Sequence, residues 1–147
     1  MTTKYLFYKV GVYMVKTLDI EEKIIKRKIY LNQLNAKRIE KSPEGRKLNI
    51  EGKAKGEIVK LDGEKCLIRL SNNIEVVPSS LFSIFVEFYA EYIFNEKIDI
   101  KILNENLEVL LNPIGNEMSF LISFITEKMT NNYIILPPGL LTKLDKE

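Results

Sequence analysis

The sequence of 147 residues contains no histidine, no tryptophan and a single cysteine. Without histidine, the chain lacks the commonest general base and the commonest side-chain ligand of transition metals. The lone Cys66 excludes an internal disulfide and a zinc site built from several cysteines. A reducing compartment suits such a chain, and we therefore expect the protein to be cytoplasmic.

Motifs that carry catalysis are also missing. The chain has no glycine-rich phosphate loop, no Gly-x-Ser-x-Gly turn and no carboxylate-rich calcium loop. Glu87 and Glu91 are four positions apart on an expected strand, which separates them by about 13 Å, more than the carboxylates of glycosidases. Cys66 lies in a strand pattern and is expected to be buried. We predict that the protein is not an enzyme and uses no cofactor and no metal.

Long hydrophobic runs are scarce. The apolar stretch 5–15 is interrupted by Lys9 and is shorter than the roughly 20 residues that a membrane span needs. We interpret it as part of an N-terminal arm and expect no membrane insertion. The 46% apolar and 29% charged content is typical of a folded soluble domain.

The most informative pattern that is present is the alternation over residues 81–94. Every second residue from Phe82 to Phe94 shares one face of the expected strand, and Leu81, Phe85, Tyr89 and Ile93 share the other. Both faces are apolar. A small domain needs one of them for its own core, so the surplus indicates assembly or the binding of apolar partners.

The remaining pattern predicts an α+β domain. Strands are expected over 29–40, 48–61 and 65–77, with Asp62-Gly63 as a hairpin turn. A helix that contains Leu103 is expected after the strand 81–94. The predicted fold is an antiparallel four-stranded sheet meander with two helices packed on one face, plus an N-terminal arm.

We expect a separate segment on each side of the main domain. An arm with a short helix over 18–28 occupies residues 1–28, the main domain covers 29–141, and a C-terminal tail covers 142–147. The helix is expected because acidic residues come early and basic residues late in 18–28, as the helix dipole favours.

The last helix of the domain carries two apolar faces. Pro113 is expected to end the preceding helix, and a second helix over 116–130 then begins. Its core-facing stripe is Met118, Leu121, Ile122, Ile125 and Met129. Phe120 and Phe124 fall nearly opposite this stripe, so they are expected to contact another protein surface or a ligand.

The charge is unevenly distributed along the chain. Residues 1–60 carry 15 Lys and Arg against 7 Asp and Glu, although the whole chain has a net charge of only +2. With the aromatics Tyr5, Phe7, Tyr8 and Tyr30, this basic half offers an alternative function, a module that binds single-stranded nucleic acid. The small overall charge and the concentration of aromatics in the acidic half argue against nucleic acid.

The segment from Glu87 to Phe94 resembles the last-strand motif of the SecB-type chaperones of protein export. That motif is an acidic residue followed by variable or small residues and a closing Gly-Ile-Phe, and Glu87, Ile93 and Phe94 match it. The break at Pro113 and the apolar close 134–138 are similar to the family's proline-broken helix pair and proline-ending tail. In element order the resemblance covers residues 29–141.

The resemblance implies a SecB-like chaperone, an ATP-independent holdase that binds unfolded or precursor polypeptides in apolar grooves. It also implies a homo-oligomer, a dimer of dimers. The candidate client-binding or interface residues are Phe85, Tyr89, Met118, Phe120, Phe124, Met129 and Tyr133. For each of them, packing in the core or between subunits is the alternative.

Candidate partner-docking residues are Glu87 and Arg38. In the family, carboxylates on the first and last strands form the surface that docks on the export ATPase. Glu87 retains the last-strand carboxylate, but Arg38 stands on the first strand. This departure argues against the export ATPase as a partner, and it leaves a general holdase or a client-specific chaperone, such as one for an antitoxin, as the expected function.

Overall fold

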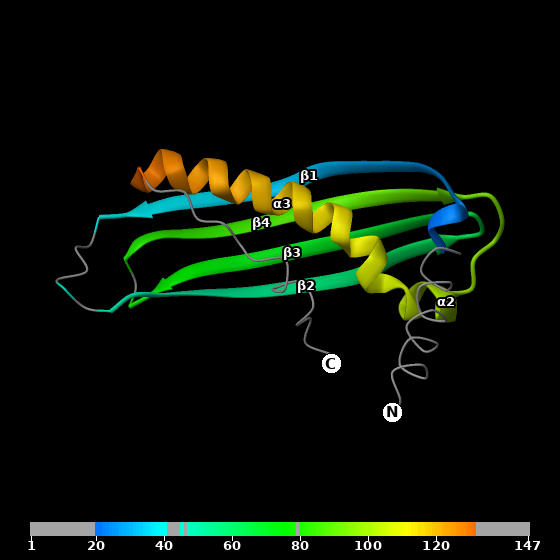
Figure 1. Ribbon diagram of the computed structural model, residues 1–147, viewed down its shortest axis with the longest axis horizontal. Helices are drawn as coiled ribbons and strands as arrows, with labels where there is room; N and C mark the ends of the chain where they lie inside the picture. The colour runs from blue at the N-terminus through cyan, green and yellow to red at the C-terminus, as the bar shows by residue number, and fades with distance from the viewer. Residues whose placement is uncertain (1–19, 41–44, 46, 79, 132–147) are drawn as a thin grey trace, which may run out of the picture.

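The computed structural model describes residues 20–40, 45, 47–78 and 80–131. Its four strands are β1 (Ile24–Ile39), β2 (Asn49–Asp62), β3 (Lys65–Val77) and β4 (Leu81–Phe94). The two helices α2 (Ile100–Glu105) and α3 (Leu107–Thr130) lie on one face of the sheet (Figure 1). The predicted α+β fold, a four-stranded antiparallel sheet with two helices on one face, is confirmed, but the predicted four-stranded meander is not, because β1 does not neighbour β2.

The strand order is β1-β4-β3-β2, with every neighbouring pair antiparallel. The last three strands form a meander, whereas β1 crosses to the far side and pairs with β4. A tight turn connects β2 and β3. Asp62 pairs with Lys65 across the turn, and Gly63 adopts a φ of 60°, a conformation that costs glycine little energy. The crossover makes β1 and β2 the two edges of the sheet.

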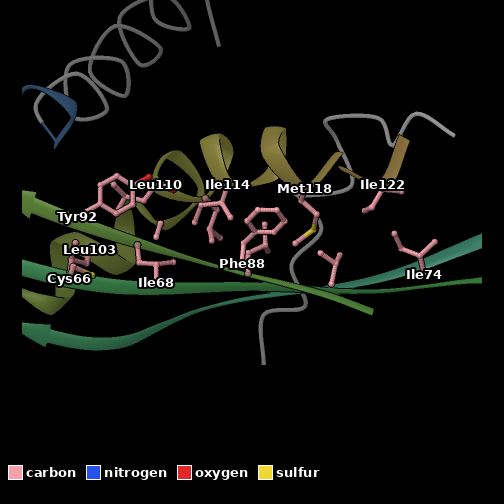
Figure 2. Packing of buried hydrophobic residues seen from close by; sticks show 14 of the residues in the cluster. Cys66, Ile68, Ile74, Phe88, Tyr92, Leu103, Leu110, Ile114, Met118 and Ile122 are labelled. Carbon is pink, nitrogen blue, oxygen red and sulfur yellow. Dashed lines mark hydrogen bonds between the residues drawn. The ribbon is translucent and has the colours of Figure 1, made fainter. Parts of the chain in front are cut away.

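The core lies between the sheet and α3. From Phe82 onward, every second residue of β4 is buried and the residues between are half-buried or, at Glu91, exposed, because one side of the strand faces the helices. From above, α3 contributes Leu110, Ile114, Met118 and Ile122, which point toward the sheet (Figure 2). The helix and the sheet approach each other closely at Gly56. A Cβ at this position would lie 2.5 Å from Leu111 Cδ1 and would clash with it, so glycine permits the contact.

By length and composition, α3 is apolar enough to cross a membrane, with a mean hydropathy of 1.2, and it is the one such helix in the described part of the chain. Its most buried stripe packs on the sheet, as in the core helix of a folded domain. Core packing therefore accounts for the apolar side of α3.

The predicted short helix over 18–28 is wrong beyond its first residues. Only residues 20–22 of the described part form a helical turn, and β1 begins at Ile24. Ile24 pairs with Phe94, and Lys26 pairs with Ile93. These long-range pairings override the local charge pattern that favours a helix.

The predicted break at Pro113 is also wrong, because α3 continues through this proline. The break occurs at Asn106, whose side-chain Nδ2 donates to Ile102 O at 2.8 Å. Its backbone N–H donates to the same carbonyl at 3.1 Å. An asparagine that satisfies the last carbonyls of α2 ends that helix, whereas Pro113 removes a single hydrogen bond from a helix held by its core contacts.

Three of the predictions fall outside the described residues. These are most of the N-terminal arm, the C-terminal end with the apolar close 134–138 and the tail 142–147, and the client-binding role of Tyr133.

Two ionisable groups, Cys66 and Tyr92, are buried in the core. Cys66 is 3% exposed, and burial raises the pKa of its thiol to about 11. Tyr92 is 1% exposed, and burial raises the pKa of its hydroxyl to about 12. The Tyr92 hydroxyl donates to Leu110 O at 2.6 Å, which fastens α3 to β4. The prediction that Cys66 is a buried structural residue is confirmed.

These shifts predict a loss of stability in alkali. In alkali, both groups keep their protons in the folded state at a pH where the unfolded chain releases them. Their contribution to the free energy of unfolding is therefore complete below pH 9.0 and falls as the pH rises. The two groups together account for a loss of about 2–4 kcal/mol in the free energy of unfolding near pH 11. Urea unfolding at several pH values measures this loss. A Cys66→Ala, Tyr92→Phe variant with the wild-type pH slope would contradict the assignment.

Candidate functional site

The outer side of α3 exposes two aromatic rings to solvent. Phe120 is 75% exposed and Phe124 is 54% exposed, and they are the two most exposed large apolar side chains of the described helices. Lys128 Nζ lies 5.5 Å from the centre of the Phe124 ring, so the patch combines apolar surface with a cation. We call Phe120, Phe124 and Lys128 the α3 outer surface. The expectation that the two phenylalanines lie away from the core is confirmed.

Two other candidates on α3 lie elsewhere. Met118 is 1% exposed and packs in the core, the alternative that the sequence left open for it (Figure 2). Met129 is half-buried and packs against the same core. Of the candidates on the described part of α3, only Phe120 and Phe124 therefore present most of their surface to a partner.

Phe85 and Tyr89 are on the side of the sheet that faces away from the helices, which we call the open face. Both are half-buried. The ring of Tyr89 stacks on Tyr30 of β1, with centroids 5.9 Å apart, and Lys28 Nζ lies 5.6 Å from the Tyr30 centroid. The predicted client-binding residues are thus divided between two surfaces on opposite sides of the molecule, and they do not form one groove.

A chain of polar contacts crosses the open face through all four strands. Glu57 of β2 accepts from Arg69 of β3, whose Nε lies 2.8 Å from Glu57 Oε1. Arg69 Nε also lies 3.7 Å from Glu87 Oε1 of β4. Glu87 Oε2 in turn accepts from Asn32 Nδ2 of β1 at 2.7 Å. We call these four residues the polar ladder.

The ladder changes the role expected of Glu87. Its side chain is 13% exposed and is shared between Asn32 and Arg69. A carboxylate held in this way stabilises the sheet and offers little free charge to a partner. The other docking candidate, Arg38, forms an ion pair of 3.0 Å with Glu40.

Glu87 and Arg38 do not form one docking surface. Arg38 pairs with the buried Phe82 and therefore faces the helix side of the sheet, whereas Glu87 lies on the open face. The carboxylate and the guanidinium that the sequence singled out are on opposite faces.

Two exposed leucines on β1 were missed by sequence reasoning. Leu31 is 44% exposed and Leu34 is 38% exposed, and both face the helix side, because they pair with the buried Phe88 and Val86. Three residues apart, they share a face only because a bulge between Leu31 and Gln33 shifts the alternation. The sequence carries no signal for this bulge.

A shallow pocket of about 280 Å³ opens at the end of the β2–β3 hairpin. Its lining includes the apolar Leu67 and Ile93 and the charged Lys60, Lys65 and Glu91. Within the described residues no cluster of three His, Cys, Asp or Glu side chains could hold a metal. The chemistry of the described surfaces is therefore that of apolar contact, charge and backbone pairing.

Comparison with known proteins identifies the fold. Over 83% of its length, the chain superimposes on 95% of the SecB-like chaperone Rv1957 of Mycobacterium tuberculosis, with a TM-score of 0.69 at 11% identity. That protein was solved in complex with a ChAD peptide from the Rv1956 HigA1 antitoxin. The chain has a SecB-like fold, as the sequence motifs had suggested.

A weaker match is a protein of unknown function from Streptococcus agalactiae. It has a TM-score of 0.49 at 17% identity, over 76% of this chain and 95% of that one. No protein-family model and no curated protein matches the chain.

The ladder predicts that Glu87 contributes to stability. Replacing Glu87 with Gln removes the charge that Arg69 and Asn32 share, and we expect the free energy of unfolding to fall by about 1 kcal/mol. The matched control is Glu91→Gln on the same strand, where the side chain is exposed. Urea unfolding compares the two variants. Equal stability of Glu87→Gln and the control would show that the ladder contributes nothing.

Proposed function

We propose that this protein is an ATP-independent chaperone, a holdase that binds unfolded or nascent polypeptides without chemical reaction. The observation that carries the proposal is the exposed Phe120 and Phe124 pair on a SecB-like fold. Exposed apolar patches of this kind mark surfaces that bind other proteins. The SecB-like relative that binds an antitoxin peptide supports a polypeptide as the ligand.

Binding uses apolar contact without a demand for sequence. An extended client segment buries its side chains against Phe120 and Phe124, and apolar contact of this kind accommodates different clients. Burial of about 400 Å² of apolar surface contributes about 10 kcal/mol before costs. The entropy that the client loses when it is ordered and bound offsets much of this free energy. Each site is therefore expected to bind with a Kd of about 1 μM. A client held at several such sites is retained and still released.

The protein acts as a homo-oligomer, a dimer of dimers. One chain leaves large apolar side chains exposed, among them Ile25, Phe120 and Phe124, and a second copy covers part of this surface. The α3 outer surface is either the interface between copies or the client site, and the variants below separate the two roles.

We infer the clients and the compartment from the SecB-like fold. The protein works in the cytoplasm on precursors for export or on one dedicated client such as an antitoxin. The engagement of Glu87 in the polar ladder and the basic Arg38 on β1 disfavour docking to an export ATPase.

Aggregation assays test the holdase function. The purified protein is expected to suppress light scattering by a chemically unfolded client at an equimolar ratio of oligomer to client, because the apolar sites capture exposed segments. Addition of ATP is expected to change nothing. Absence of suppression at this ratio would sink the proposal.

The α3 outer surface is tested with Phe120→Ser, Phe124→Ser. If it is the client site, client affinity falls at least about tenfold while native mass and melting temperature stay constant, because exposed residues contribute little to the core. If it is an interface, the oligomer dissociates. The matched control, Ile100→Ser, Ile102→Ser, removes exposed apolar side chains from α2. Native mass spectrometry and peptide titration provide the measurements, and a double variant that resembles the control in both would remove α3 from the function.

A further inference from the structure

The pocket at the end of the β2–β3 hairpin opens on the open face of the sheet. Its volume of about 280 Å³ is close to the lower limit of about 300 Å³ for pockets that hold drug-sized ligands, so a ligand that fits it is small. We call it the hairpin pocket. Cys66 and Tyr92 contribute to its lining, although their side chains are buried in the core. The lining residues whose side chains lie on the open face are Lys60, Asp62, Lys65, Leu67, Glu91 and Ile93.

The strand register arranges this region as two rows of side chains across the sheet. From β2 to β1, the first row is Asp62, Lys65, Ile93 and Lys26, and the second row is Lys60, Leu67, Glu91 and Lys28. Each row thus holds two lysines, one acid and one apolar residue. Leu67 and Ile93 lie on neighbouring strands, one row apart, so their half-buried side chains form a small apolar patch.

A β-bulge in β2 turns Lys60 toward this pocket. The pairing of β2 with β3 shifts between Ile58 and Lys60, so Val59 is an extra residue. Ile58 and Leu61 both pack against the core as a result, and Lys60 faces the open side. With regular alternation, Lys60 would share the side of Ile58. The bulge is therefore what places a cation beside the apolar patch.

The charges of the two rows do not cancel. Asp62 lies directly opposite Lys65, and Glu91 lies directly opposite Lys28. The other lysine of each row lies opposite an apolar residue. Within the described part of the chain, none of the charged side chains of the two rows forms an ion pair. Four lysines against two carboxylates leave a surplus of two positive charges around the apolar patch.

This arrangement does not suit a metal ion or a free phosphate. Asp62 and Glu91 are two strands and one row apart, so their backbones are more than about 9 Å from each other at a spacing of about 4.8 Å per strand. Among the described residues, no three acidic, Cys or His side chains gather closely enough to hold a metal. A free phosphate would contact the lysines alone and leave the apolar patch in water. The occupant that matches both features is an anion with an apolar body.

The hairpin pocket is compatible with assembly into an oligomer. Two copies that join through a sheet edge pair the backbone groups of that edge and extend the sheet. The side chains of the pocket stand on the face of the sheet, over β2, β3 and β4. Association through the β1 edge therefore leaves the pocket in place.

We propose that the hairpin pocket binds a small amphipathic carboxylate, such as a medium-chain fatty acid. The carboxylate lies between the ammonium groups of Lys60 and Lys65, which come from neighbouring strands, and the apolar body covers Leu67 and Ile93. Such a body spans about 10 Å, the distance from β2 to β4. This site goes beyond the proposed chaperone function and does not depend on it.

Titration of the full-length protein with octanoate, below its micelle concentration, tests the proposal. We expect a Kd of about 0.1–1 mM, and binding at least about fivefold tighter than that of octanol or octylammonium at low salt. The advantage over octanol is expected to shrink as salt is added. Affinity is expected to rise from butanoate to octanoate and to level off near decanoate, because the pocket is small. Calorimetry measures the affinities, and NMR shifts of the Leu67 and Ile93 methyl groups report where the ligand binds.

Matched lysine variants locate the carboxylate. Lys60→Gln, Lys65→Gln is expected to weaken octanoate binding at least about fivefold, to the level of octanol, because it removes both cations of the pocket. The control Lys53→Gln, Lys55→Gln removes two lysines from the same face of β2 outside the pocket, and it is expected to change binding by less than about twofold. All four lysines are exposed, so the melting temperature is expected to stay as in the wild type.

The Phe120→Ser, Phe124→Ser variant separates the pocket from the α3 outer surface. It is expected to keep the octanoate affinity of the wild type, and a loss of binding would move the ligand to α3 and overturn the proposal. Equal affinities for octanoate and octylammonium, or equal effects of the two lysine variants, would also overturn it. So would an affinity that keeps rising through dodecanoate, which is the behaviour of adsorption to exposed apolar surface. An apolar tetrapeptide with a free C-terminal carboxylate that binds as tightly as octanoate would assign the pocket to the ends of polypeptides instead.

Discussion

The fold depends on the burial of one side of β4 against α3, because β4 also pairs with β1 and β3. The buried side chains from Phe82 to Phe94 lie in the central strand, which pairs with β1 on one side and β3 on the other. A single oblique helix cannot cover the whole face of a sheet with strands of up to 16 residues (Figure 1). The surfaces that stay uncovered are the open face, the two edges of the sheet and the outer side of α3. A partner would bind at one of these surfaces.

These uncovered surfaces differ in how many of their side chains already have partners within the chain. On the open face, the polar ladder and the stacked pair of Tyr30 and Tyr89 engage the groups at the centre of the sheet. On α3, Phe120 and Phe124 have little but Lys128 beside them. Satisfied polar groups favour a structural role, and unsatisfied apolar surface favours binding, so α3 is the better candidate for client contact.

Apolar contact at the α3 outer surface is the mode of client binding that the proposed function uses. Contact with exposed aromatic rings discriminates weakly among clients, since every unfolded chain offers apolar side chains. Such contact needs an extended client, which an unfolded or nascent chain provides.

How far each feature could be predicted depends on the range of the interactions that decide it. Local alternation determined β3 and β4 to the residue, the hairpin at Gly63 and the outward position of Phe120 and Phe124, since a period of two or 3.6 assigns each side chain to a face. Only the tertiary structure decided that β1 begins at Ile24 and that Leu31 and Leu34 share a face, because strand pairing and a bulge set them. It also decided that Glu87 is bound by Asn32 and Arg69 of two other strands. Such contacts join residues far apart in the chain, and no local pattern encodes them.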